Sequence, residues 1–326
     1  MISTKNLTRR FGSLVALDNL TLEIGPGEIF GFIGPNGAGK STTMKILACL
    51  LKQDSGEAIV CGKNTRTDSD AIRRLVGYMP DFLGVYDDLT ADEYLQFFAA
   101  AFTVPRSRRR AVIDQVLELT DLTDKKHAMV DSLSRGMQQR LGVARVLIHE
   151  PQVLLLDEPA SGLDPRARIE MRSLLIELRK MGKCLMVSSH ILSELAEMCT
   201  SIGIVERGSL LFAGSIDDAF RKVRSAALDA DGPSIGAARE RIVVVLHPAS
   251  AAIDSIAAAL RRDSRVESVA IESPTSLNID LRLSEREGHA FAADLLIASG
   301  ARIHSLAPAE INLEDAFLKL TTGALQ

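Results

Sequence analysis

Residues 34–42 form the stretch of this chain whose residue types are best suited to chemistry. The stretch matches the phosphate-binding pattern G-x-x-x-x-G-K-[ST]. Glycines have no Cβ atom, so the backbone can turn tightly and direct its N–H groups at phosphate oxygens. In this pattern Lys40 reaches the β- and γ-phosphates and the Ser41 hydroxyl holds Mg²⁺. The stretch predicts that a nucleoside triphosphate is bound through Gly34, Pro35, Asn36, Gly37, Ala38, Gly39, Lys40, Ser41 and Thr42.

Two further groups of polar residues each follow a short apolar run. Asp157 and Glu158 come after the apolar residues 153–156, and His190 comes after residues 184–187 and two serines. Two adjacent carboxylates are costly to bury without a role, so one is suited to bind a metal and the other to act as a general base. A lone histidine is usually structural. His190 is a candidate functional residue only because of the expected position of its strand.

The surrounding sequence predicts the elements that position these residues. Residues 28–33 are typical of a short buried strand and residues 42–51 of a helix, which is the context that the glycine pattern requires. The unbroken apolar runs before Asp157 and His190 are typical of central parallel strands. In open parallel sheets the ligand lies outside the carboxyl ends of the strands. The three groups are therefore expected to meet in one cleft.

A fourth segment, residues 133–140, opens a patterned helix. Met137, Leu141, Ala144 and Ile148 recur at helical spacing, and Ser134 stands where an N-cap belongs. A small hydroxyl residue and a glycine at a helix N-terminus form a possible anion site. A plain N-cap is the better interpretation of this segment when it is taken alone.

The N-terminal part, residues 1–26, has the alternation of β-strands. Phe11 in this part is suited to stack on an adenine ring, although a single phenylalanine in a β segment is more often a core residue. Residues 75–80 predict a strand that a proline ends, and Asp81 follows at once.

Composition and charge exclude several classes of function. The net charge is −4, and the arginines at 106 and 108–110 have no aromatic residues interleaved, so they are typical of a solvated helix face and we expect no nucleic-acid partner. We find no signal peptide and no window of about 20 consecutive apolar residues. Any membrane role is therefore expected to depend on a partner.

The length of 326 residues and the pattern of predicted helices and strands indicate two domains. Residues 1–227 would form the nucleotide-binding domain, residues 228–239 a linker, and residues 240–326 a C-terminal accessory or regulatory domain. The last of these shows a β-α-β-β-α-β order that fits a small ferredoxin-like α+β module. Residues 311–318 are typical of an amphipathic helix.

The order of these motifs resembles the ATP-binding cassette (ABC) ATPases, in particular the nucleotide-binding subunits of transporters. The resemblance covers roughly residues 1–225 and includes the signature-like segment Leu133–Gln138, the Asp157–Glu158 pair, the loop Ser161–Asp164 and His190. It implies a P-loop NTPase α/β fold with a mostly parallel sheet core, an N-terminal antiparallel β part and a helical subdomain at about residues 86–150.

By this resemblance two copies would dimerise and hold ATP between the glycine loop of one and the signature helix of the other. Asp157 would bind Mg²⁺ through its shell, Glu158 would polarise the attacking water, and His190 would contact the γ-phosphate. Phe11 becomes an expected adenine-stacking residue. The residues expected to act on the partner's ATP are Ser134, Arg135, Gly136, Met137, Gln138 and Asp164.

Two positions depart from the common pattern of this family. Asp81 stands where the family usually has Gln, so it adds a negative charge to the candidate Mg²⁺ site of Ser41 and Asp157. Arg135 and Met137 replace the commoner Gly and Gln of the signature. This variant resembles the cassettes of ABC-2-type exporters of drugs, polysaccharides or lipids.

The resulting expectation is an ATPase that powers a separate integral-membrane permease from the cytoplasmic face of the inner or plasma membrane, with ATP and Mg²⁺ as cofactors and a homodimer as the working unit. One alternative is a soluble cassette protein that acts without a permease. The other is a poorly hydrolysing ATP sensor, which Asp81 makes conceivable.

Overall fold

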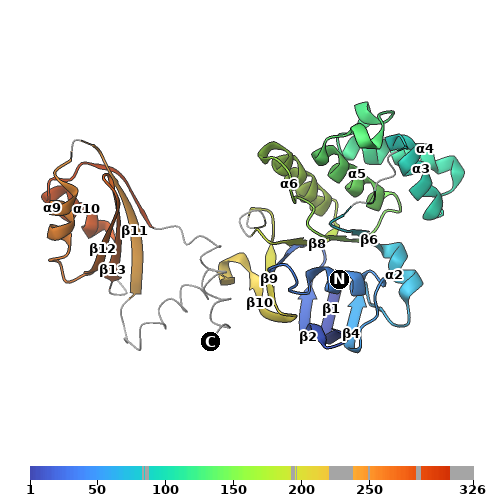
Figure 1. The fold of residues 1–326 in the computed structure, drawn as a ribbon, viewed down its shortest axis with the longest axis horizontal. Coiled ribbons are helices and arrows are strands. Elements are labelled where there is room, and N and C mark those ends of the chain that lie inside the picture. The colour runs from blue at the N-terminus through green and yellow to red at the C-terminus, as the bar shows by residue number, and fades with distance from the viewer. Residues whose placement is uncertain are drawn as a thin grey trace. The chain divides into compact units, whose positions relative to one another are not determined.

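The computed structural model describes residues 1–82, 84, 88–191, 195, 197–219, 238–248, 250–283 and 288–308. These residues form two compact units, one up to residue 219 and one from residue 238 (Figure 1). The predicted helix at 311–318 and most of the predicted linker lie outside the described residues.

The first unit is built on a six-stranded sheet with the strand order β10-β9-β3-β8-β7-β6. The five strands from β9 to β6 are parallel, and β10 pairs with β9 in the antiparallel direction. This is the mostly parallel core that the sequence predicted. In chain order the strands are β3 (Ile29–Ile33), β6 (Val76–Met79), β7 (Val153–Leu156), β8 (Cys184–Ser189), β9 (Ser201–Glu206) and β10 (Ser209–Ser215).

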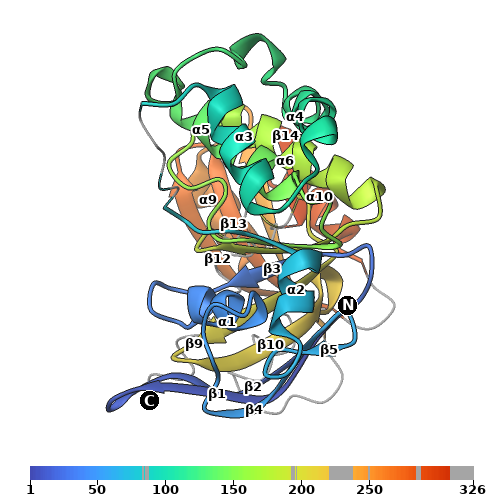
Figure 2. The ribbon, with the colours of Figure 1, turned by 90° about the vertical axis from the view of Figure 1, so that its right-hand side faces the viewer.

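The central strands are buried on both faces, which explains their unbroken apolar runs. In β7, Leu154 and Leu156 belong to one apolar core and Val153 and Leu155 to the other. Helices α5 (Arg135–Leu147) and α6 (Pro165–Lys180) cover the first face, together with α3 (Ala91–Ala101) and α4 (Arg106–Leu119) further out (Figure 2).

On the opposite face, helix α1 (Lys40–Leu47) packs between the parallel sheet and a second, antiparallel sheet (Figure 2). The second sheet has the order β2-β1-β4-β5 and contains the predicted N-terminal strands. Its strands are β1 (Ile2–Phe11), β2 (Leu14–Ile24), β4 (Ser55–Val60) and β5 (Lys63–Asn64). Helix α1 is shorter than predicted, because Cys49 adopts a left-handed conformation (φ +56°) just beyond its end.

Local sequence explains the helical part between β6 and β7. Helix α3 begins with a capping box, in which the Thr90 hydroxyl accepts a hydrogen bond from the Glu93 backbone and the Glu93 carboxylate accepts one from the Thr90 backbone. The short turns η1 (Thr123–Lys125) and η2 (Val130–Ser132) connect α4 to α5. Helix α2 (Ser69–Leu75), which precedes β6, was not predicted.

The second unit is a four-stranded antiparallel sheet of order β12-β13-β11-β14 with two helices. Its chain order is the predicted β-α-β-β-α-β. The first strand begins at Ala238, within the last residues of the predicted linker. The elements are β11 (Ala238–Leu246), α9 (Ile253–Leu260), β12 (Val266–Ser273), β13 (Ser276–Leu283), α10 (Ala290–Ala298) and β14 (Ile303–Pro308).

None of the helices in the described ranges is both long enough and apolar enough to cross a bilayer.

Candidate nucleotide-binding and catalytic site

The glycine loop joins the carboxyl end of β3 to the first turn of α1, as the sequence predicted. Gly39 caps the helix in a left-handed conformation (φ +105°), and a Cβ atom there would lie 2.6 Å from the Ala16 carbonyl oxygen of β2. Only glycine fits this close approach. Pro35, Asn36 and Gly37 are exposed at the tip of the loop, whereas Gly34 and Ala38 are buried beneath it.

Lys40 is buried, with 6% of its surface exposed, and its ammonium group points back into the loop. Its Nζ donates to the Gly34 carbonyl oxygen at 2.6 Å and lies 3.4 Å from Glu158 Oε1. Ser41 and Thr42 follow in the first turn of α1 and are half-buried. The structure thus places the cation expected to bind phosphate next to the carboxylate expected to act as a base.

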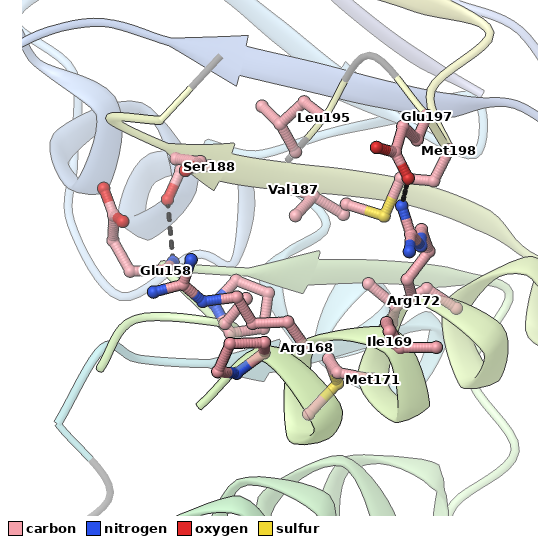
Figure 3. A pocket seen from close by; sticks show the side chains of 15 residues that line it. Glu158, Arg168, Ile169, Met171, Arg172, Val187, Ser188, Leu195, Glu197 and Met198 are labelled. Carbon is pink, nitrogen blue, oxygen red and sulfur yellow. Dashed lines mark hydrogen bonds and ion pairs between the residues drawn. The ribbon is translucent and has the colours of Figure 1, made fainter. Parts of the chain in front are cut away.

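Asp157 is buried at the end of β7, with 3% exposure. Its Oδ1 accepts a hydrogen bond from the Ser188 hydroxyl at 2.6 Å, and the same Ser188 oxygen accepts one from the Glu158 backbone N–H at 2.9 Å. Figure 3 shows Ser188 of β8 bonded to Glu158. Ser188 therefore fixes both acidic residues. The sequence pattern does not single out Ser188, although it stands two residues before His190 on the strand beside β7.

Glu158 lies between two groups that its carboxylate contacts separately. Oε2 is 2.8 Å from His190 Nδ1, while Oε1 faces Lys40. The backbone of Glu158 has φ +52°, which is uncommon for a residue other than glycine and costs about 1–3 kcal/mol. Strain of this kind is concentrated at functional sites. The glycine loop, the acidic pair and His190 thus converge as predicted.

Asp81 lies two residues beyond β6, the strand that pairs with β7. Its pKa is raised, first by partial desolvation and then by the negative charges of Asp157 and Glu158, while Arg135 and His190 oppose the shift. The hydroxyl of Tyr78 in β6 is buried, and no hydrogen-bond partner for it occurs in the described part of the chain. Its pKa is raised by burial and by Asp157 and Asp81.

These carboxylates fit a site for a hard divalent cation. Asp81, Asp157 and Glu158 concentrate negative charge at one edge of the sheet, and the Ser41 hydroxyl stands on the neighbouring helix turn. Within the described ranges no three His, Cys, Asp or Glu side chains are grouped as a complete metal site. Mg²⁺ usually binds through one or two carboxylates and substrate phosphates, so this donor set suits it.

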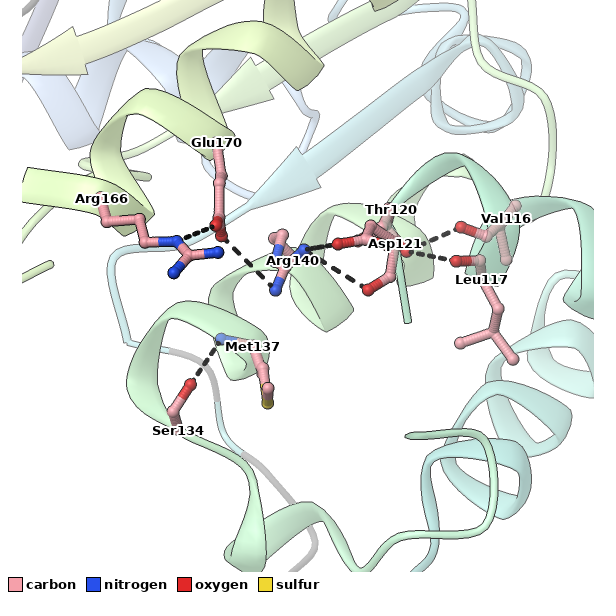
Figure 4. A network of polar contacts seen from close by, with 9 residues as sticks. All are labelled: Val116, Leu117, Thr120, Asp121, Ser134, Met137, Arg140, Arg166 and Glu170. Atoms are coloured by element: carbon pink, nitrogen blue, oxygen red, sulfur yellow. Dashed lines mark hydrogen bonds and ion pairs between the residues drawn. The ribbon is translucent and has the colours of Figure 1, made fainter. Parts of the chain in front are cut away.

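The signature residues lie at the N-terminus of α5, and among the described residues no hydrogen bond or ion pair joins them to the glycine loop of the same chain. The Ser134 hydroxyl caps the helix by accepting a hydrogen bond from the Met137 N–H at 3.3 Å (Figure 4). The Gln138 side chain donates to the Val130 carbonyl oxygen at 3.0 Å. Asp164 caps α6 in the same way, accepting from the Ala167 N–H at 2.9 Å.

Phe11 is 45% exposed at the end of β1, so it is not a core residue. It pairs with Leu14, and the same hairpin carries the Ala16 carbonyl that Gly39 approaches. The Arg9 guanidinium lies over the Phe11 ring, 4.7 Å from its centroid. This geometry leaves aromatic surface near the glycine loop.

A comparison with family models matches residues 17–161 to the ABC transporter family. The Bacillus subtilis protein "Uncharacterized ABC transporter ATP-binding protein YhcH" is 39% identical over 220 residues, which cover 67% of this chain and 71% of that protein. The Bacillus licheniformis "Bacitracin transport ATP-binding protein BcrA" is 40% identical over 212 residues, covering 65% and 68%. The Escherichia coli "Probable multidrug ABC transporter ATP-binding protein YbhF" is 38% identical over 218 residues, covering 67% of this chain but only 38% of that protein.

Solved structures support the same assignment. A dimeric structure of MJ0796, described as a bacterial ABC transporter cassette, superposes with a TM-score of 0.60 at 28% identity, covering 66% of this chain and 99% of that one. A second MJ0796 dimer, described as a post-hydrolysis state bound to ADP and Pi, gives a TM-score of 0.60 at 27% identity over the same shares. The chain therefore belongs to the family of ABC transporter ATP-binding proteins and is an ATPase, as its motifs predicted.

Proposed function

We propose that this protein is the ATP-hydrolysing subunit of an ABC exporter, in which ATP closes a dimer of two copies and hydrolysis reopens it. The observation that carries the proposal is the position of Glu158 between Lys40 and His190, directly after Asp157. The exporter assignment rests on relatives named for multidrug and bacitracin transport.

In the proposed mechanism, nucleotide binding draws Lys40 away from the Gly34 carbonyl and Glu158 toward the β- and γ-phosphates. The carboxylate of Glu158 is then free to accept a proton from the attacking water, and His190 holds the γ-phosphate. Ser41 and Asp157, with Asp81 nearby, would hold a Mg²⁺ ion, which would supply positive charge against the phosphates. Positioning and electrostatics supply most of the rate, because phosphoryl transfer needs little covalent chemistry from the protein.

The dimer is proposed because Ser134, Arg135 and Asp164 are exposed at helix N-termini. Ser134 caps α5 and Asp164 caps α6, and N-terminal helix ends attract anions. In the proposed pairing the segment Ser134–Gln138 of one copy meets the phosphates bound by its partner, and Phe11 stacks on the adenine. The dimeric state of the related MJ0796 cassettes supports this arrangement.

The decisive test of the catalytic assignment is Glu158→Gln. The variant keeps the shape of the side chain but removes its capacity to accept a proton, so the turnover number should fall by roughly 10²- to 10⁴-fold while ATP binding is retained. Steady-state phosphate release and a nucleotide-binding titration measure the two quantities. Unchanged turnover would reject Glu158 as the base.

The proposed contact with a permease can be tested at Phe82. Phe82 follows Asp81 directly and is 83% exposed. We propose that it contributes to the permease contact and that the cassette is held at the cytoplasmic face of the membrane in this way. Phe82→Ser should release the chain from membranes without changing its basal ATPase activity, and a variant that still copurifies with membranes would contradict the contact.

The negative charge that Asp81 adds beside Asp157 and Glu158 favours one alternative, a poorly hydrolysing ATP sensor. Steady-state ATPase measurements with and without membranes separate the two functions. A sensor would bind ATP without appreciable turnover in either condition.

A further inference from the structure

The aromatic ring of Phe11 is covered on one side by an arginine of its own strand. Arg9 and Phe11 stand two residues apart in β1, and the centre of the Arg9 guanidinium lies 4.7 Å from the centroid of the Phe11 ring. A guanidinium at this distance is attracted by the negative face of an aromatic ring and stacks on it. Arg9 therefore covers one face of Phe11 and restricts the rotation of its side chain.

An acidic residue from another part of the sequence holds Arg9 in turn. The Asp54 carboxylate accepts hydrogen bonds from Arg9 Nη1 at 2.7 Å and from the Arg10 backbone N–H at 2.7 Å. The Asp54 N–H donates to the Thr8 carbonyl oxygen at 2.9 Å. Asp54 is thus bonded to three consecutive residues of β1. Its carboxylate is fixed by the backbone, so it can orient the guanidinium over the ring.

The rest of the Phe11 ring faces solvent beside the glycine loop. Phe11 keeps 45% of its surface exposed although Arg9 lies over it. The hairpin that carries it approaches the loop closely, because a Cβ atom on Gly39 would lie 2.7 Å from Leu17 Cδ2 of β2. Exposed aromatic surface in this position is suited to stack on a planar base. The positive charge of Arg9 is balanced by Asp54, so Arg9 is poorly suited to bind phosphate itself.

We infer that Arg9 and Asp54 are positioning residues for the adenine of ATP: Asp54 orients Arg9, and Arg9 holds the Phe11 ring so that the base stacks on its other face. The inference rests on the proposed stacking of adenine on Phe11 and deepens it. A ring that is held before the nucleotide arrives loses less conformational freedom on binding. Arg9 therefore contributes to the affinity for the base and not to the affinity for the phosphates.

The test compares a nucleotide with a probe that has no base. Dissociation constants of the full-length chain are measured for the β,γ-imido analogue of ATP, which is not hydrolysed, and for inorganic tripolyphosphate. Arg9→Ala should weaken binding of the analogue about two- to fivefold, as expected for an exposed cation–π contact, and leave tripolyphosphate binding unchanged. Arg9→Lys should lose part of the affinity, because lysine keeps the charge but lacks the planar group.

Arg108→Ala is the matched control. It removes the same charge from another exposed ion pair of the first unit, in which Arg108 Nη2 lies 3.3 Å from Glu150 Oε1. This variant should change neither dissociation constant. Asp54→Asn should weaken binding of the analogue less than Arg9→Ala does, because the amide oxygen still accepts a hydrogen bond. Thermal melting confirms that each variant is folded.

A double variant separates positioning from direct contact with the nucleotide. Phe11→Ala should itself weaken binding of the analogue on the order of tenfold, as the loss of a stacking partner does. In this background Arg9→Ala should have no further effect, since the ring that Arg9 holds is gone.

Four results would overturn the inference. They are an unchanged affinity for the analogue in Arg9→Ala, equal losses for the analogue and tripolyphosphate, a loss that persists in the Phe11→Ala background, and tighter binding of the analogue in Arg9→Ala, which would mean that Arg9 occupies the face that the base needs. If Phe11→Ala leaves the affinity unchanged, the proposed stacking fails and this inference fails with it. The proposed ATPase function is tested separately, at Lys40 and Glu158, and stands or falls by those variants.

Discussion

The two units of the chain use charged side chains in opposite ways. In residues 1–219, Lys40, Glu158 and His190 meet at one edge of a parallel sheet. In residues 238–308, charges pair across antiparallel strands, as Arg241 does with Asp280 (Nε to Oδ1, 2.6 Å). Parallel strands bring all their carboxyl ends to the same edge, whereas antiparallel strands divide them between two edges. The direction of the strands thus decides which unit can assemble a site.

The largest expected effect is that of Lys40→Ala. It removes a buried cation that lies within the glycine loop, so the affinity for ATP should fall on the order of a hundredfold. A fluorescent-nucleotide titration measures this affinity. Normal affinity in the variant would mean that the loop is not the phosphate cradle.

Ser188→Ala tests whether the acidic residues depend on the neighbouring strand. The change deprives Asp157 Oδ1 and the Glu158 N–H of their shared partner. ATPase turnover should fall about 10- to 100-fold, as for other residues that orient metal ligands. Ser173→Ala is the matched control, because among the described residues the exposed Ser173 hydroxyl bonds to its own helix α6, at the Ile169 carbonyl oxygen. Equal activities would show that Ser188 does not position the pair.

Asp81 in the first unit and Asp263 in the second have pKa values that shift in opposite directions. The pKa of Asp81 is raised, so its ionisation destabilises the folded state as the pH rises above the ordinary value of 3.8. Hydrogen bonds from Arg265 lower the pKa of Asp263 in the second unit to about 2, so its contribution to stability is present above 3.8 and is lost as the pH falls toward 2.

At neutral pH and without nucleotide or Mg²⁺, Asp81→Asn should therefore be at least as stable as the wild type. Asp263→Asn should lose about 1 kcal/mol of unfolding free energy. The Asp81 difference should shrink when denaturation is repeated at about pH 4, and the Asp263 difference should shrink only below that, as the pH approaches about 2. An Asp81→Asn variant that is less stable than the wild type at neutral pH would contradict the electrostatic account of this edge.

Arg241→Ala should have the smallest effect. The Arg241–Asp280 pair lies on an exposed sheet face, where ion pairs contribute roughly 0–1 kcal/mol. Urea denaturation and ATPase assays should both give values close to those of the wild type. A large loss of activity would reveal a role for this unit that its side chains do not indicate.

The sequence allowed the strand, loop and helix around Lys40 to be predicted, because apolar runs and glycine spacing are local signals. The position of Glu158 beside His190 also followed, since parallel strands end at the same edge. The contacts of Ser188 and the ion pair of Arg9 with Asp54 did not, because each depends on the register or approach of elements that lie far apart in the chain. Helix α2 was overlooked because its seven residues are too short to show a period.

The register of β7 against β8 has a consequence for how this chain can change over time. Leu156 stands opposite Val187, and this alignment brings Asp157 and Ser188 together at the strand ends. Inserting or deleting one residue in β7 would turn its leucines onto the wrong faces of the sheet and would also part the acidic pair from its serine. Such a change of register would impair both folding and ATP turnover. Insertions and deletions should therefore be confined to the loops, whereas substitutions that keep the register of β7 can be tolerated.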